Sequence, residues 1–108
     1  MDYALALDIW DRVKASTLAD LRQDLVEAAV RYARLRVDWL LADPEKQASI
    51  GSDRSASHNA FIATCDILSR NMGKIGEDIS WRKLLGEDRK RIGDFACFVH
   101  CRLGISAR

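Results

Sequence analysis

The sequence has few of the residues that interrupt or cross-link a chain: one proline, six glycines and three cysteines among 108 residues. Together with 48% hydrophobic and 31% charged residues, this composition excludes a collagen-like, low-complexity or disordered chain. The length allows one hydrophobic core, because domains typically have about 100 to 150 residues. We therefore expect a single domain over residues 1–108.

Long apolar runs are also missing. A membrane-spanning helix needs roughly 20 apolar residues, whereas the C-terminal half offers only the run Phe95–Val99. The N-terminus has no basic residue before its short apolar stretch, which Asp8 interrupts, so it does not resemble a secretory signal. An odd number of cysteines favours reduced thiols over a disulfide framework. These features predict a cytoplasmic protein that does not associate with membranes.

Charge of one sign is lacking as well. Seventeen Lys and Arg residues balance sixteen Asp and Glu residues, a net charge of +1, which removes the simplest argument for a nucleic-acid or membrane-surface partner. Part of this balance is local, since five acid–arginine pairs are four residues apart, the spacing that stabilises a helix: Asp8–Arg12, Glu27–Arg31, Asp66–Arg70, Asp78–Arg82 and Glu87–Arg91. Residues 82–91 are the exception, with five bases and two acids. An acidic partner is expected to bind there first.

Apolar residues recur at alternating spacings of three and four, which is typical of amphipathic helices. The pattern predicts helices over about residues 3–14, 17–42, 55–76 and 87–103, with a short helical turn near 80–85. Thr17 is expected to cap the second helix, and Pro44 to end it. The polar segment 45–54 is predicted to be a connection between helices. The fold class is therefore all-α: a compact bundle of four main helices plus a short extra turn.

Cys97, His100 and Cys101 would lie within a turn of one another on a helix, which raises the question of a metal site. A structural zinc ion needs four ligands. The remaining candidates, His58 and Cys65, would be about 10 Å apart along their helix and cannot both join one site. We therefore expect no metal, no cofactor and thiols that pack as small core residues. With no nucleophile turn or assignable base, the sequence identifies no catalytic residues, and a small enzyme or ligand binder with a polar site near Asp94 is the weaker alternative to a non-enzymatic protein.

Asp94 is the strongest candidate for a polar site, because it follows Gly93 and precedes an apolar run. A buried carboxylate needs a partner, and His58, Arg70 or Arg82 could supply one. The alternative interpretation, which we favour, is that Gly93 and Asp94 mark a close helix crossing with the acid at its rim.

Residues 68–86 partly match a helix-turn-helix DNA-binding motif, with Gly73 at the turn and Ile79 in the second helix. Nearby bases would contact phosphates: Arg82, Lys83, Arg89, Lys90 and Arg91. Lys74 and Arg82 occupy positions where the motif has apolar residues, so DNA binding is an alternative and not the leading hypothesis.

The leading hypothesis is a non-enzymatic interaction or regulatory module that forms a homodimer or binds a protein partner. Three tryptophans, Trp10, Trp39 and Trp81, are many for a core of this size, and aromatic residues are enriched at interfaces. The predicted partner-binding residues are Trp39, Trp81, Arg82, Lys83, Arg89, Lys90 and Arg91. An intramolecular core with Trp39 near its end is the alternative.

Short stretches of the C-terminal half resemble short all-helical bacterial or prophage proteins of unknown function. These stretches are His58-Asn59, residues 68–72, Trp81-Arg82, residues 93–97 and residues 106–108. The resemblance implies a bacterial cytoplasmic protein and brings no catalytic residues with it.

Overall fold

The computed structural model describes residues 2–76, 86 and 88–106, and it is an all-α bundle. Its helices are α1 (Tyr3–Ala15), α2 (Ala19–Leu41), α3 (Pro44–Lys74) and α5 (Arg89–Ser106). The described residues contain no strand, so the predicted fold class is confirmed. The predicted helical turn at residues 80–85 lies outside the described residues. No described helix combines the length and the apolar character that crossing a membrane requires.

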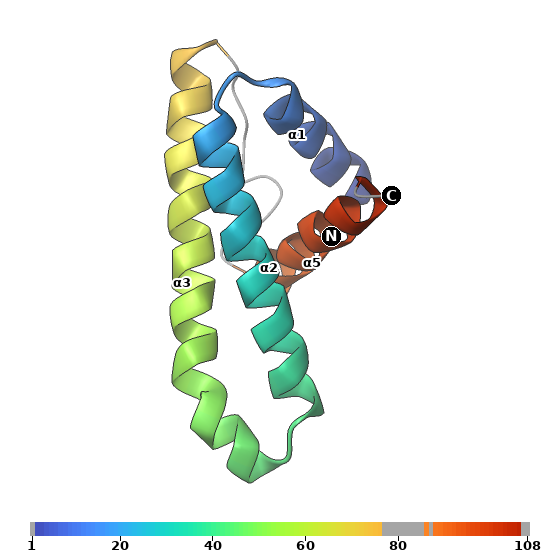
Figure 1. Ribbon diagram of the computed structural model, residues 1–108, viewed down its shortest axis with the longest axis vertical. Helices are drawn as coiled ribbons and strands as arrows, with labels where there is room; N and C mark the ends of the chain where they lie inside the picture. Colours follow the sequence, from blue (N-terminus) through green and yellow to red (C-terminus); the bar gives the residue numbers. More distant parts are fainter. Residues whose placement is uncertain (1, 77–85, 87, 107–108) are drawn as a thin grey trace.

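Helices α2 and α3 form a long antiparallel hairpin whose connection is only Ala42 and Asp43 (Figure 1). The Asp43 side chain accepts a hydrogen bond from the backbone N–H of Lys46 at 2.8 Å, which caps α3. Pro44 occupies the first turn, where its missing N–H costs nothing. A capped proline start thus lets α3 begin immediately after α2 ends.

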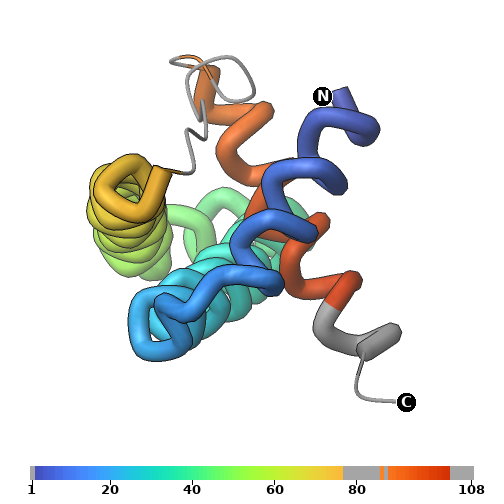
Figure 2. The backbone as a smooth tube through the Cα atoms, turned by 90° about the horizontal axis from the view of Figure 1, so that it is seen from above, coloured from blue at the N-terminus to red at the C-terminus, as the bar shows by residue number. Residues whose placement is uncertain are grey.

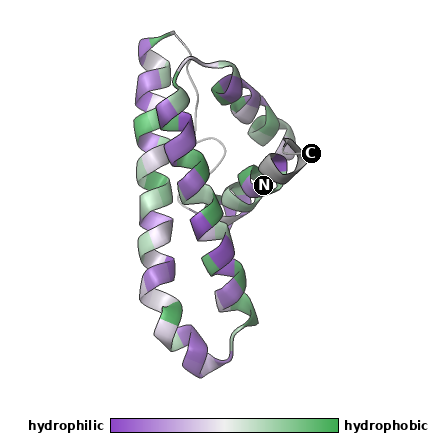
Figure 3. Ribbon diagram, in the orientation of Figure 1, coloured by the Kyte–Doolittle hydropathy of each residue, from purple (hydrophilic) through white to green (hydrophobic). Residues whose placement is uncertain are grey.

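The prediction of a connection over residues 45–54 is therefore wrong, because this segment is the N-terminal part of α3. Its polarity has a different cause. The hairpin end extends beyond α1 and α5, so both of its helices are largely solvated there and carry polar side chains (Figures 1 and 3). The expected cap of α2 is also wrong: α2 begins at Ala19, and no side chain caps its first turn.

The other two helices leave the Asp43 end of the hairpin uncovered, and the contacts of α5 with α2 extend as far as Arg36. Helix α5 crosses α2, and α1 lies against α5, as the view from above shows (Figure 2). On α3, a stripe of residues at alternating spacings of three and four is buried: His58, Phe61, Cys65, Leu68 and Met72. Ile75, the next residue of this series, follows the helix and is 48% exposed. The core combines this stripe with buried residues of the other three helices.

A row of aromatic rings joins three helices in the centre of the core. The Phe61 ring of α3 is 6.3 Å from the Tyr32 ring of α2 and 6.1 Å from the Phe95 ring of α5, measured between centroids. These separations are within the range in which aromatic pairs attract each other. The row therefore fixes where α5 meets the hairpin.

Candidate functional site

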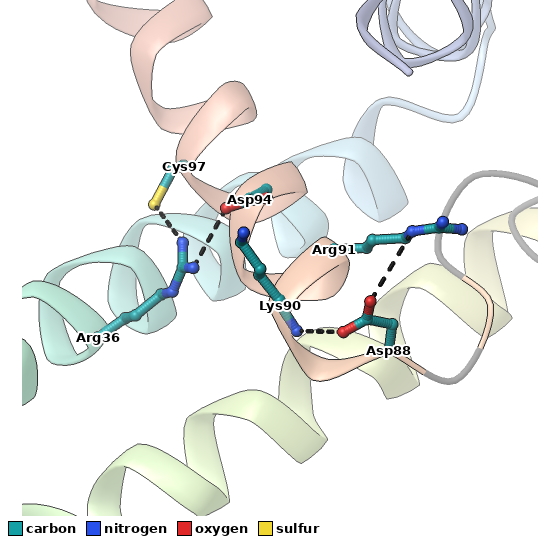
Figure 4. A network of polar contacts seen from close by, with 6 residues as sticks. All are labelled: Arg36, Asp88, Lys90, Arg91, Asp94 and Cys97. Carbon is teal, nitrogen blue, oxygen red and sulfur yellow. Dashed lines mark hydrogen bonds and ion pairs between the residues drawn. The ribbon is translucent and has the colours of Figure 1, made fainter. Parts of the chain in front are cut away.

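The crossing of α2 and α5 is held by one arginine with two partners (Figure 4). Arg36 Nη2 lies 3.1 Å from Asp94 Oδ1, and Nη1 donates to Cys97 Sγ at 3.6 Å. The Arg36 and Asp94 side chains are 19% and 26% exposed, so the pair is more sheltered than the other ion pairs of the described residues. Partial burial makes the loss of either partner costly.

Gly93 provides the space in which Arg36 lies. A Cβ atom at this position would be 2.7 Å from Arg36 Nε and 2.9 Å from Arg36 Cδ, closer than non-bonded atoms normally approach. The φ of Gly93 is not positive, so the effect of a larger residue here would be to force the flexible end of the Arg36 side chain to move. The pair Gly93-Asp94 marks a close helix crossing with a half-buried acid, as the favoured sequence interpretation states.

The partner of Asp94 is Arg36, which the sequence analysis did not name. Arg70 instead donates from Nε to the carbonyl oxygen of Asp66 on its own helix and is exposed. It lies twelve residues after His58 on α3, or about 18 Å along the axis. The polar site predicted from His58, Arg70 and Asp94 is thus not assembled, and Arg82 lies outside the described residues.

Replacing Gly93 by alanine is expected to displace Arg36 from Asp94 and Cys97. The substitution gains up to about 1 kcal/mol of helix propensity, but it loses a half-buried ion pair worth about 1 to 3 kcal/mol, so the net effect is destabilising. In an Arg36→Ala background the steric conflict is gone, and the same substitution should stabilise. Urea denaturation of the four proteins measures this change of sign; an equal effect of Gly93→Ala in both backgrounds would contradict it.

His58 is buried between α2 and α3, with 7% of its surface exposed. Its ring meets the Tyr32 ring edge-on, with 5.3 Å between centroids, and its Nδ1 is 3.3 Å from Asn59 Oδ1. Burial lowers the pKa of His58, and the positive charges of Arg89 and Arg54 lower it further against the opposing contact with Asn59. The imidazole is therefore neutral at neutral pH.

Trp39 is half-buried at the hairpin and not freely exposed. The guanidinium carbon of Arg54 lies 4.5 Å from the centre of its indole ring, in cation–π geometry. Its carbonyl oxygen accepts a hydrogen bond from Gln47 at 2.9 Å. Trp39 is thus held by contacts within the hairpin and is only half-buried. Arg54 was not recognised from the sequence, although it precedes His58 by one helical turn.

The basic residues at the start of α5, Arg89, Lys90 and Arg91, are exposed. Asp88 partly neutralises them: its carboxylate accepts from the Lys90 backbone N–H at 2.9 Å and lies 3.8 Å from Arg91 Nε (Figure 4). Trp81, Arg82 and Lys83 lie outside the described residues.

The turn of the predicted helix-turn-helix motif is misplaced. Gly73 lies inside α3, which continues to Lys74. The chain turns at Ile75 and Gly76, where Gly76 adopts a φ of 82°, a conformation that favours glycine. The expected turn at Gly73 is therefore wrong, and Ile79 lies outside the described residues.

The three cysteines are free thiols in different environments. Cys65 is buried, and desolvation raises its pKa far above the usual range. Cys97 is half-buried, but Cys101 is exposed, so the expectation that all three pack in the core is wrong for Cys101. In the part of the chain that the structure describes, no three His, Cys, Asp or Glu residues are grouped closely enough to hold a metal ion.

The outer surface of α2 carries two shallow grooves. One, of about 490 Å³, includes Val26 and Val30 of α2 and reaches Asp53 of α3. The other, of about 410 Å³, lies between Val37 of α2 and Cys97, His100 and Cys101 of α5. Arg34 and Asp38 line both grooves. These two charged residues therefore lie between the grooves on α2.

No family model, curated protein or solved structure matches the chain. The surface and contacts of its helices are therefore the basis for a functional proposal.

Proposed function

We propose that the protein is a small, non-enzymatic interaction module that forms a homodimer through α2. The observation that carries this proposal is an apolar strip on α2, referred to here as the α2 strip: Val26, Val30, Ala33, Val37 and Leu40. Its spacings of four, three, four and three residues are those of the seam of a coiled coil. The strip borders the core stripe of the same helix.

The C-terminal part of the α2 strip is poorly covered by the rest of the chain. Val37 is 46% exposed and Leu40 is 60% exposed, and the neighbouring Leu41 is 82% exposed. Contiguous apolar surface of this kind on a small protein marks an interaction site. A second copy of α2 would remove it from water.

The strip is complementary to itself in an antiparallel arrangement. If Val30 packs against Leu40 of the partner subunit, the register places Val37 level with Ala33 of the partner subunit, which is already buried in its own chain, and a twofold axis repeats both pairings. Asp38 then lies opposite the turn of the partner helix that carries two exposed arginines, Arg31 and Arg34. This charge complementarity favours a second copy of the chain as the occupant.

Light scattering coupled to size-exclusion chromatography tests the proposal. The protein is expected to elute as a dimer, and Val37→Asp or Leu40→Asp should weaken association by at least about 30-fold, because a central interface residue contributes about 2 kcal/mol or more. Ile67→Asp is the matched control, since Ile67 is 41% exposed on α3. A protein that stays monomeric at millimolar concentration would refute the proposal.

A charge exchange tests the register. Asp38→Arg alone places like charges together and should weaken the dimer, whereas the double variant Arg34→Asp/Asp38→Arg restores opposite charges and should recover much of the affinity. Equal weakening by the single and double variants would argue against this register.

Arg89, Lys90 and Arg91 support a secondary role in binding an acidic protein partner, because they are exposed on one helix end. DNA binding is the weaker alternative, given the position of the turn at Gly76, and a mobility-shift assay with duplex DNA at low salt separates the two.

The three free thiols support a cytoplasmic location.

A further inference from the structure

Two nitrogen atoms between α2 and α3 are buried without a hydrogen-bond partner among the described residues: Arg54 Nε and His58 Nε2. The two residues are four positions apart on α3, and so are on the same face of the helix and about 6 Å apart along its axis. Most buried polar atoms in native proteins have a partner. Arg54 Nε is a donor, and His58 Nε2 becomes one when the ring is protonated, so together the two nitrogens would suit a ligand that accepts hydrogen bonds.

The charges near these nitrogens are predominantly positive. Arg54 and Arg89 both act electrostatically on His58, and they act together with Arg36 on Tyr32, whose pKa is nevertheless raised by burial. These arginines come from three helices, α3, α5 and α2. Among the described residues, Asp94 is the acid that forms an ion pair with one of these arginines, Arg36. Arg54 and Arg89 are thus left as an excess of positive charge beside His58.

The hydrogen bond to Asn59 determines what His58 Nε2 can do. Because Asn59 Oδ1 accepts, the neutral imidazole carries its hydrogen on Nδ1, and Nε2 is left as an acceptor. In this tautomer Nε2 has no hydrogen to donate to an anion. Protonation converts Nε2 into a donor, and an anion bound there would compensate the third positive charge.

We propose that a doubly charged oxyanion of the phosphate class binds between Arg54, His58 and Arg89, and that His58 Nε2 takes up a proton from solvent when the anion binds. The Tyr32 and Trp39 rings form the apolar side of this site, since one packs on His58 and the other on Arg54. Arg89 is exposed, so the site opens to solvent at the start of α5. The anion is either free phosphate or the phosphate group of a small ester.

Isothermal titration calorimetry with sulfate, inorganic phosphate and glycerol phosphate tests the proposal on the full chain. Sulfate keeps its charge across the relevant pH range, so any proton uptake with sulfate comes from the protein. The pKa of His58 is lowered in the free protein and should rise when the anion is bound. Affinity should therefore be at least about tenfold higher near pH 6 than near pH 8, and heats measured in two buffers should report uptake of up to about one proton.

The variants separate the site from general surface charge. Arg54→Gln and Arg89→Gln should each weaken binding by about tenfold or more, since each removes a charge-assisted hydrogen bond. His58→Gln should abolish the proton uptake. Arg91→Gln is the matched control, because Arg91 is an exposed neighbour on α5 paired with Asp88, and it should change affinity less than about twofold.

Two results would overturn the proposal. The first is the absence of saturable binding of all three anions at millimolar concentration. The second is equal weakening by Arg91→Gln and Arg89→Gln, which would indicate diffuse attraction to the basic helix end. Arg89 is exposed, so Arg89→Gln keeps the test decisive even if the variants at the buried positions fail to fold. Binding of glycerol phosphate assigns the site to esters, and binding of the inorganic ions alone assigns it to free anions.

Discussion

Phe95→Ala is expected to destabilise the protein by about 3 to 5 kcal/mol, the usual cost of removing a fully buried aromatic side chain. The Phe95 ring is completely buried and lies 6.1 Å from both the Phe61 and the Phe98 rings, stacked on the latter at 14°. Its loss leaves a cavity at the point where α5 meets the hairpin. Domains of this size have about 5 to 15 kcal/mol of stability in total, so the variant should be at or near the limit of folding.

Guanidinium denaturation followed by circular dichroism measures this effect. Phe95→Leu is the control, because it keeps an apolar side chain that fills much of the space and should cost less than about 1.5 kcal/mol. If Phe95→Ala lowers the free energy of unfolding by less than about 1 kcal/mol, α5 does not pack as described.

Trp10→Ala should destabilise the protein by a similar amount, about 3 to 5 kcal/mol, but the loss of structure should be concentrated in α1. Trp10 is 2% exposed and is the largest buried side chain of α1. Helix α1 meets α5 and has few other anchors, among them a ring pair between Tyr3 and Phe98 with 6.5 Å between centroids. Removing Trp10 should therefore release α1 before the hairpin.

Hydrogen exchange measured by mass spectrometry distinguishes local release from global unfolding. In Trp10→Ala, amides of α1 should lose protection while those in the centres of α2 and α3 keep most of theirs. Trp10→Phe is the control: it keeps an aromatic ring and removes Trp10 Nε1, which is buried without a partner, so its cost should be under about 1.5 kcal/mol. Uniform loss of protection in Trp10→Ala would contradict an independently anchored α1.

The helical periodicity was sufficient to predict the fold class and most helix bodies. The stripe from His58 to Met72 is buried as its spacing requires, and α1 and α5 lie close to their predicted bounds. The start of α3 was not predictable from hydropathy, because a solvated helix has the same polar composition as a loop. Asp43 and Pro44 were the available signal, since this pair both ends one helix and caps the next.

The contacts between helices were harder to predict than the helices. Arg36 has the spacing of a core position on α2, but its pairing with Asp94 depends on the angle and height at which α5 crosses. The local sequence contains no information on that crossing except Gly93. This glycine indicated a close approach of another helix but not which residue approaches it. In the same way, helical periodicity does not separate Val30 and Val37 from the core residues of α2, although both lie outside the core.

The two-residue connection at Ala42 and Asp43 also has a consequence for the order of folding. Pairing α2 with α3 closes a very small loop and costs little chain entropy, whereas the bond from Arg36 to Cys97 joins residues 61 positions apart. The hairpin is therefore expected to form early and to present the apolar residues on which α5 later packs. Docking of α5 is expected to be a later and slower step. During that interval the face of α2 that later receives α5 is open, and it is adjacent to the strip proposed to bind a second chain. Association and folding would then compete for neighbouring surfaces of one helix.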